Sequence, residues 1–279
     1  MKKVGILGDK LSHSLSPFFQ NVGFEYWNID ATYMKWPVSI EEFSARIDLL
    51  RNTDYLGANV TVPYKELAYT LVDHIDDVAM KIGAINTIVN KEGILYGFNT
   101  DVFGFVKSLK TQTSFNPVGK HVLIIGAGGA ARSAIYGLIE EGVTSGVIAN
   151  RTFARAKSVA DEFSASLNLT PVTIYDNKFR VLVKDVDLIV NCSSMGMKNG
   201  PAEYETPLFS ANIPKNCIVY DMVYNPEKTP LLLEAQKSGA VCLGGLWMLI
   251  YQGAESFKLW TQKQAPIELM YSQALSHLM

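Results

Sequence analysis

The segment that most limits the fold of this chain is residues 121–133, where an apolar run passes into a glycine-rich turn and then into a helical pattern. The turn reads Gly126-x-Gly128-x-x-Ala131, a motif that is informative because of this strand-to-helix context. Gly126 can make the tight turn, Gly128 lets backbone N–H groups approach a pyrophosphate, and Ala131 is small enough for helix-on-strand packing. We therefore predict a doubly wound Rossmann-type domain that binds a dinucleotide through Gly126, Ala127, Gly128, Gly129 and Ala130.

The next expected strand indicates which dinucleotide is bound. About 20 residues after the glycines, a site for NAD usually carries an acidic residue for the ribose 2′-hydroxyl. This chain has Asn150, Arg151 and Thr152 there, followed by Arg155. A guanidinium can bind a 2′-phosphate through charge-assisted hydrogen bonds, which a carboxylate would repel. The alternative is a solvated helix start, but cations at a helix N-terminus are unfavourable unless they meet an anion, so the pattern favours NADP.

Short runs rich in valine and isoleucine alternate with segments of helical period along most of the chain. This alternation favours an α/β fold with a largely parallel sheet. The length of 279 residues is typical of about two domains. The turn-rich stretch at residues 111–119, just before the strand at 121–125, is the expected boundary between them.

The charge balance excludes several classes of partner. The chain has 25 Lys and Arg against 27 Asp and Glu, with no basic run. It therefore supplies neither a nucleic-acid-binding surface nor a polybasic membrane patch. The first apolar stretch is too short for a signal peptide and no run of about 18 apolar residues follows, so we expect a cytoplasmic protein without a membrane segment.

Cysteine and histidine usage argues against metal binding. Cys192, Cys217 and Cys242 are widely spaced in apolar or strand-like surroundings, so we predict buried thiols and no disulfide. The four histidines form no HxxxH or HExxH pair. We therefore expect no metal site.

The first half of the chain offers the polar groups that a substrate site requires. Four polar clusters, at residues 8–17, 59–65, 83–87 and 97–101, lie at or near the ends of expected strands. Open α/β sheets bind their ligands at strand ends. A nicotinamide enzyme that reduces a carbonyl also needs a group that exchanges the alcohol proton while hydride moves. These clusters are the expected source of such groups.

Eight motifs in order give the chain a resemblance to the shikimate dehydrogenase family. They are SxSP, NVTxPxK, GAxNT, GxNTD, GAGGAxR, NRTxxR, DxxYNPxxT and GxxMLxxQ. In this chain they occupy residues 14–17, 59–65, 83–87, 97–101, 126–132, 150–155, 221–229 and 245–252. An ordered set that covers nearly the whole chain is far more specific than any single motif.

The resemblance implies an enzyme that reversibly reduces 3-dehydroshikimate to shikimate with NADPH, in the pathway to chorismate and the aromatic amino acids. Lys65 and Asp101 match its catalytic pair, with Asp101 expected to position Lys65 and to bond the substrate hydroxyl. Residues that match substrate positions are Ser14, Ser16, Thr61, Asn86, Asp101, Tyr224 and Gln252. Further matches to cofactor positions are Asp77, Met222 and Gly245, beside Asn150, Arg151, Thr152, Arg155 and the glycine-rich turn.

Without the resemblance, some of these residues have simpler interpretations. Ser14 and Ser16 would cap the helix that is expected from residue 17. Lys65 would be a solvated lysine at a helix start, and Met222 would be a core residue. Lys10 and Trp247 depart from the family pattern, since proline and glycine are usual at these positions, and so does the pair Cys192-Ser193.

The resemblance also implies a domain organisation. We expect a substrate-binding domain at residues 1–101, an NADP-binding Rossmann-type domain at 102–245, and C-terminal helices at 246–279 that return to the substrate domain. The expected partner is the small-molecule substrate, and the family permits monomers and homodimers alike.

Two other functions stay open. A quinate or dual-specificity dehydrogenase would use the same catalytic pair on a ring with one more hydroxyl group. A non-catalytic sensor of NADP or of a metabolite would not need a proton-transfer group, yet Lys65 and Asp101 are both present.

Overall fold

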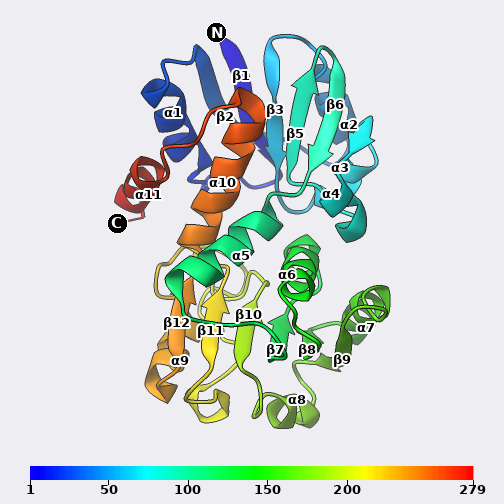
Figure 1. Cartoon of the computed structure of the whole chain (residues 1–279), viewed down its shortest axis with the longest axis vertical. Helices are drawn as coiled ribbons and strands as arrows, with labels where there is room; N and C mark the ends of the chain where they lie inside the picture. The colour runs from blue at the N-terminus through cyan, green and yellow to red at the C-terminus, as the bar shows by residue number, and fades with distance from the viewer. Residues whose placement is uncertain (279) are drawn as a thin grey trace. The chain divides into compact units, whose positions relative to one another are not determined.

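The computed structural model describes residues 1–278 and divides the chain into two compact units. Unit 1 comprises Met1–Gly104 and the segment from Ile250 onward, and unit 2 comprises Phe105–Leu249. The two divisions fall within helix α5 (Asp101–Gln112) and helix α10 (Leu246–Thr261). Each unit is built on one six-stranded sheet with helices beside it, so the predicted α/β fold class is confirmed (Figure 1).

Unit 1 contains a mixed sheet in the order β2-β1-β3-β5-β6-β4. Its strands are β1 (Lys2–Gly8), β2 (Ala31–Pro37), β3 (Tyr55–Val60), β4 (His74–Ile75), β5 (Thr87–Lys91) and β6 (Ile94–Phe98). Its helices are α1 (Ser16–Tyr26), α2 (Phe43–Leu49), α3 (Lys65–Tyr69), α4 (Asp77–Ile82), α11 (Ile267–Ser276) and the larger part of α10. Strand β1 lies next to the edge strand and pairs in parallel with β2 and β3.

The expectation of largely parallel pairing is wrong for β5 in the other half of this sheet, whereas β4 and β6 are again parallel. Strand β5 runs antiparallel to both β3 and β6. The cause is the tight turn between β5 and β6, where Glu92 and Gly93 have φ values of 55° and 91°. Gly93 N donates to the Asn90 side chain at 2.8 Å, which fixes the turn. So short a connection joins antiparallel strands, because a parallel pair needs a long crossover.

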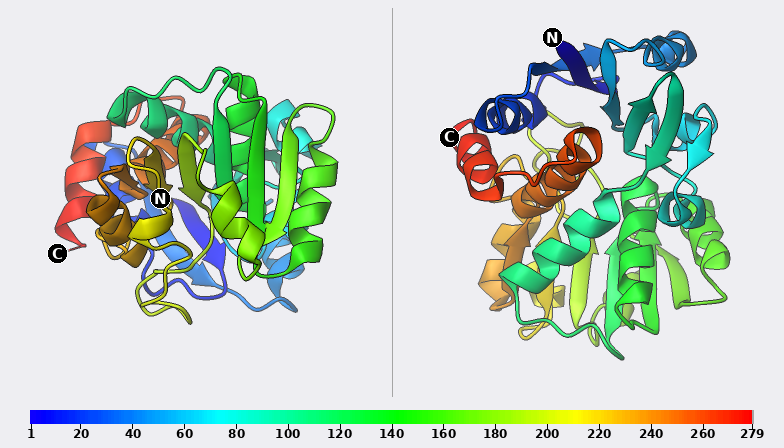
Figure 2. Two further views of the ribbon diagram at one scale, coloured as in Figure 1. Left: turned by 90° about the horizontal axis from the view of Figure 1, so that it is seen from below. Right: turned by 45° about the horizontal axis from the view of Figure 1, so that its top comes forward.

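Helices α1 and α11 pack against each other in unit 1 (Figures 1 and 2). A Cβ atom at Gly23 of α1 would lie 2.5 Å from Met270 of α11 and 2.8 Å from the Phe257 ring of α10. Glycine at this position therefore permits the close approach of α1 to both helices. Beside it, the rings of Phe24 and Phe257 lie 5.2 Å apart, which adds to the core of the unit.

Unit 2 contains a fully parallel sheet in the order β12-β11-β10-β7-β8-β9. Its strands are β7 (His121–Ile125), β8 (Ser145–Asn150), β9 (Asn168–Thr173), β10 (Leu188–Asn191), β11 (Ile218–Asp221) and β12 (Val241–Gly244). Its helices are α6 (Gly129–Glu140), α7 (Phe153–Glu162), α8 (Asn177–Leu182), α9 (Pro230–Ser238) and the short 3₁₀ helix η1 (Ser210–Asn212). The strand order reverses between β7 and β10, which is where doubly wound sheets bind ligands.

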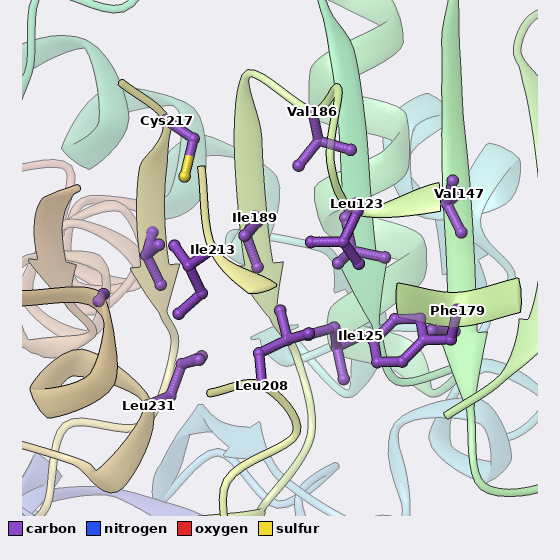
Figure 3. Packing of buried hydrophobic residues seen from close by; sticks show 14 of the residues in the cluster. Leu123, Ile125, Val147, Phe179, Val186, Ile189, Leu208, Ile213, Cys217 and Leu231 are labelled. Carbon is purple, nitrogen blue, oxygen red and sulfur yellow. The ribbon is translucent and has the colours of Figure 1, made fainter. Parts of the chain in front are cut away.

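The core of unit 2 explains why its strands read as continuous apolar runs. Leu123, Ile189 and Val219 on neighbouring strands are fully buried and pack in one cluster with Phe179 of α8 (Figure 3). Cys217 lies in the same cluster and is 1% exposed. The prediction that all three cysteines are buried is wrong for Cys242, which is exposed because β12 is an edge strand, and Cys192 is partly exposed.

Candidate active site

Lys65 and Asp101 form an ion pair in unit 1. Lys65 is the first residue of α3, just after the end of β3, and Asp101 is the first residue of α5, just after β6. Lys65 Nζ lies 2.5 Å from Asp101 Oδ2, and the two side chains are 15% and 7% exposed. The structure thus brings the two predicted catalytic residues into direct contact in a largely desolvated position.

Asn86 holds the other oxygen of this carboxylate. Its Nδ2 donates to Asp101 Oδ1 at 2.8 Å and reaches Gln252 Oε1 of α10 at 3.3 Å. Its Oδ1 accepts from the backbone N–H of Thr100 at 2.8 Å. Because a backbone N–H can only donate, this bond fixes which end of the amide faces Asp101. Asp101 is therefore held at one oxygen by Asn86 and presents the other to Lys65.

The predicted carboxylate-binding residues lie at the ends of β1 and β3. A Cβ atom at Gly8 would lie 2.6 Å from Thr61 Cγ2, so Thr61 sits against the loop that leads to Ser14 and Ser16. Ser16 is buried, and its side chain hydrogen-bonds with Tyr33. Ser14 Oγ accepts from Ser16 N at 3.3 Å, but the N-cap of α1 is Leu15, which has no side-chain capping bond, so neither serine is the N-cap of this helix.

The glycine-rich turn of unit 2 has the form that a pyrophosphate site needs. Gly126 has a φ of 110°, and a Cβ there would lie 3.1 Å from the Cys192 backbone. Gly128 is the N-cap of α6, has no side-chain capping bond, and would direct a Cβ into open space. The N–H groups of the first helical turn are thereby accessible to an anion, so the turn fits the phosphates of a dinucleotide.

The end of β8 carries two exposed guanidinium groups. Arg151 and Arg155 form no ion pair with another described residue and lie at the start of α7. Asn150 Nδ2 donates to the Thr152 carbonyl at 3.0 Å, which shapes the turn between them. Two cations at a helix N-terminus are unfavourable unless an anion is bound, so this arrangement fits a 2′-phosphate.

Met222 and Tyr224 lie on the loop after β11, with Gly245 beside them. A Cβ at Gly245 would lie 2.1 Å from the Met222 carbonyl oxygen, so glycine is required for this approach. Burial raises the pKa of Tyr224 to about 12. Met222 is partly exposed rather than fully in the core. Asp77, by contrast, is an exposed residue in the first turn of α4, where Asp76 is the N-cap.

Sequence reasoning missed the role of Asp221, which is fully buried at the end of β11. Its carboxylate accepts from Thr229 Oγ1 at 2.6 Å, Asn191 Nδ2 at 2.9 Å and Val223 N at 3.0 Å. It therefore ties the end of β10 and the N-cap of α9 to the loop that carries Met222 and Tyr224. An aspartate that ends an apolar strand within the DxxYNPxxT motif was the available signal.

The departures from the family pattern lie in different surroundings. Lys10 is exposed, whereas Trp247 is partly buried in the first turn of α10.

Among residues 1–278 there is no group of three or more His, Cys, Asp or Glu placed to hold a metal ion. Within the same range, no helix is both long and apolar enough to cross a membrane.

Sequence comparisons cover nearly the whole chain. Residues 6–88 match the profile of the shikimate dehydrogenase substrate binding domain, residues 109–198 that of shikimate/quinate 5-dehydrogenase, and residues 245–275 that of the shikimate 5′-dehydrogenase C-terminal domain. A shikimate dehydrogenase (NADP(+)) of Methanopyrus kandleri is 39% identical over 278 residues, which is 99% of this chain and 95% of the relative. The chain belongs to the shikimate dehydrogenase family.

Other members of the shikimate dehydrogenase family agree in sequence and in fold. A shikimate dehydrogenase (NADP(+)) of Moorella thermoacetica is 40% identical over 96% of this chain and 90% of its own. The crystal structure of shikimate 5-dehydrogenase from Thermus thermophilus, in complex with NADP(H) and shikimate, has a TM-score of 0.88 at 33% identity and covers 99% of both chains. The predicted family and the two-domain Rossmann-type fold are confirmed.

The burial of Asp221 predicts a pH-dependent stability. Burial raises the pKa of this carboxyl from 3.8 to about 6, although hydrogen bonds from Thr229, Val223 and Asn191 oppose the rise. A raised acid pKa stabilises the fold at low pH, and this contribution is lost as the pH rises through about 6. Between pH 4 and pH 7, the free energy of unfolding should therefore fall by about 2 kcal/mol relative to the Asp221→Asn variant.

Urea unfolding of both proteins at several pH values measures this difference. Asp161→Asn, which changes an exposed aspartate of the same unit, is the control and should follow the wild type. Parallel stability curves for the wild type and Asp221→Asn would contradict the assignment.

Proposed function

We propose that this chain catalyses the reversible NADP-linked interconversion of 3-dehydroshikimate and shikimate, in the pathway to chorismate and the aromatic amino acids. The observation that carries this proposal is the Lys65–Asp101 pair, held by Asn86, in a member of the shikimate dehydrogenase family. A proton-transfer group beside a carboxylate suits an alcohol–ketone interconversion.

Lys65 exchanges the proton of the substrate C3 oxygen in this proposal. In the reducing direction, its ammonium group gives a proton to the carbonyl oxygen as the alcohol forms. In the oxidising direction, the neutral amine takes the hydroxyl proton. NADP, when bound, accepts or supplies the hydride at C3. Asp101 orients Lys65 and accepts a hydrogen bond from the substrate hydroxyl, while Asn86 keeps the carboxylate in place.

The remaining polar residues divide the substrate between them. Short hydroxyls at Ser14, Ser16 and Thr61 bind the carboxylate without a permanent ion pair. The side chains of Asn86, Asp101, Gln252 and Tyr224 bind the ring hydroxyls. A substrate hydroxyl left unpaired in a desolvated site costs about 1 to 3 kcal/mol, so this density of donors and acceptors selects for a polyhydroxylated ring.

Cofactor binding is proposed for unit 2. The turn from Gly126 to Ala130 holds the pyrophosphate, and Asn150, Arg151, Thr152 and Arg155 hold the 2′-phosphate. The residues proposed beside the nicotinamide are Met222 and Gly245, and Asp77 of unit 1 completes the proposed cofactor set. In terms of domains, we propose substrate binding for residues 1–101, NADP binding for 102–245, and helices that support the substrate domain for 246–279.

A cytoplasmic location and a homodimer stay predictions of the same account. Cell fractionation checks the location, and sedimentation analysis checks the oligomeric state.

The Lys65→Ala variant tests the catalytic assignment. The wild-type protein should reduce NADP⁺ with shikimate, and the variant should lose at least about 100-fold in kcat, because general acid–base catalysis is removed. The measurement is the absorbance of the reduced nicotinamide, with shikimate and quinate compared side by side. Lys258→Ala removes an exposed, ion-paired lysine of the same unit and should retain activity.

The outcomes separate the alternatives. Comparable turnover of quinate would replace the proposal with a dual-specificity dehydrogenase. Binding of NADP without turnover of either substrate would support a sensor and contradict the proposed enzyme.

The arginines that follow β8 predict a preference for NADP⁺ over NAD⁺. Arg151→Ala combined with Arg155→Ala should raise the KM for NADP⁺ at least about 100-fold, since two charge-assisted interactions are removed and each is worth about 1.5 to 3 kcal/mol. The KM for NAD⁺, which lacks the 2′-phosphate, should change little. Arg180→Ala on α8 is the matched control, because it removes an exposed guanidinium of the same unit. Equal losses for the two cofactors would contradict recognition of the 2′-phosphate.

A further inference from the structure

Three buried hydroxyl groups meet behind Asn86 in unit 1. Thr87 begins β5, Thr100 precedes α5, and Ser256 lies on α10, and their side chains are 0%, 3% and 0% exposed. Ser256 Oγ lies 2.7 Å from Thr87 Oγ1 and 3.1 Å from Thr100 Oγ1, and the two threonine oxygens are 3.3 Å apart. We refer to these three residues as the hydroxyl cluster.

The hydroxyl cluster contacts both ends of the Asn86 amide. Thr87 Oγ1 donates to Asn86 Oδ1 at 3.1 Å, beside the bond from Thr100 N. Thr100 Oγ1 lies 3.2 Å from Oδ1 and accepts from Nδ2 at 2.9 Å. The donors Thr87 Oγ1 and Thr100 N attract the oxygen of the amide to their side. The Asn86 Nδ2 group is consequently directed toward Asp101 and Gln252. The orientation on which the Asp101 carboxylate depends is thus set by groups that do not contact Asp101 through their own side chains.

Ser256 is the member of the cluster that joins it to another element. Its Oγ lies 3.0 Å from the Gln252 carbonyl oxygen, one helical turn earlier, and accepts from Asn59 Nδ2 at 3.1 Å. Because the hydroxyl has one proton, Ser256 donates either to this carbonyl oxygen or to Thr87, and the second state leaves the Thr87 proton for Asn86 Oδ1. Gln252 contacts Asn86 directly, so two successive turns of α10 act on the same amide, one by contact and one through the hydroxyl cluster. Asn59 is a residue of β3, so its bond to Ser256 also fixes α10 against this strand.

We propose that Ser256 is a positioning residue for the reaction, because its hydroxyl holds Thr87 and Thr100 where they orient the Asn86 amide toward Asp101 and Gln252. This inference rests on the proposed function. Ser256 acts through Asn86 and has no chemical step of its own. An alanine at this position would retain the helix but would leave the buried side chains of Asn59, Thr87 and Thr100 without a shared partner.

The Ser256→Ala variant tests this role. Its kcat for shikimate oxidation should fall about tenfold and its KM for shikimate should rise a few-fold, as expected for the loss of a buried hydrogen-bonding group. Its KM for NADP⁺ should stay unchanged. Ser272→Ala is the matched control, because Ser272 makes the same bond to the carbonyl four residues earlier, at 2.9 Å to Glu268, but on the exposed surface of α11.

A double-mutant cycle with Asn86→Ala distinguishes positioning from general support of the fold. If Ser256 acts through Asn86, Ser256→Ala should have little further effect on kcat in the Asn86→Ala background. If it only stabilises unit 1, the two losses should multiply. Ser256→Cys, which keeps the volume and a weak donor, should lie between the wild type and Ser256→Ala, and it provides the same cycle if the alanine variant does not fold.

These measurements distinguish failure of the positioning role of Ser256 from failure of the proposed function. A wild-type protein that turns over shikimate, with Ser256→Ala equal to Ser272→Ala or with multiplicative losses, would overturn the positioning role alone. A wild-type protein that turns over no shikimate would overturn both this role and the proposed function.

Discussion

Buried polar groups must be paired, and in unit 1 this requirement converges on the side chain of Asn86. The amide is 2% exposed and sits where the ends of β3, β5 and β6 meet α10. Its oxygen is held by Thr100 and its nitrogen is turned to Asp101, which in turn faces Lys65. The Lys65–Asp101 pair is thus the end of this network that is least buried, with side chains 15% and 7% exposed. Such a network is rigid because each member would lose its partner if another moved.

Unit 2 offers a different set of groups to an anion. Its binding edge offers backbone N–H groups at Gly128 and two guanidinium groups after β8, and both features are stabilised when a phosphate is present. Behind this edge, the Asp221 carboxylate fixes the loops after β10 and β11 by accepting three hydrogen bonds. Burial disfavours the charged form of this carboxylate and therefore raises the pKa of Asp221. The binding residues proposed for unit 1 are thus neutral amides and hydroxyls beside one ion pair, whereas those proposed for unit 2 include two cations.

Local signals predicted the parts of the fold that short segments specify. The turn at Gly126 and the apolar strand before it were both predicted from the sequence. Elements whose existence depends on tertiary pairing were missed, including the two-residue β4, the edge strand β12 and the short α8. The family motifs supplied the residues that are proposed to bind ligands. They gave no indication of Ser256, because its partners Asn59, Thr87 and Thr100 are distant in sequence and only the fold brings them together.

The central claim is that the pair held by Asn86 is the proton-transfer centre for a shikimate hydroxyl. A crystal structure of the protein with shikimate bound tests it most directly. The account predicts the C3 oxygen of shikimate within about 3 Å of Lys65 Nζ and of an Asp101 carboxylate oxygen, with Asn86 still bonded to Asp101. Shikimate bound with its C3 oxygen out of reach of Lys65, or a complex in which Asn86 has released Asp101, would contradict it.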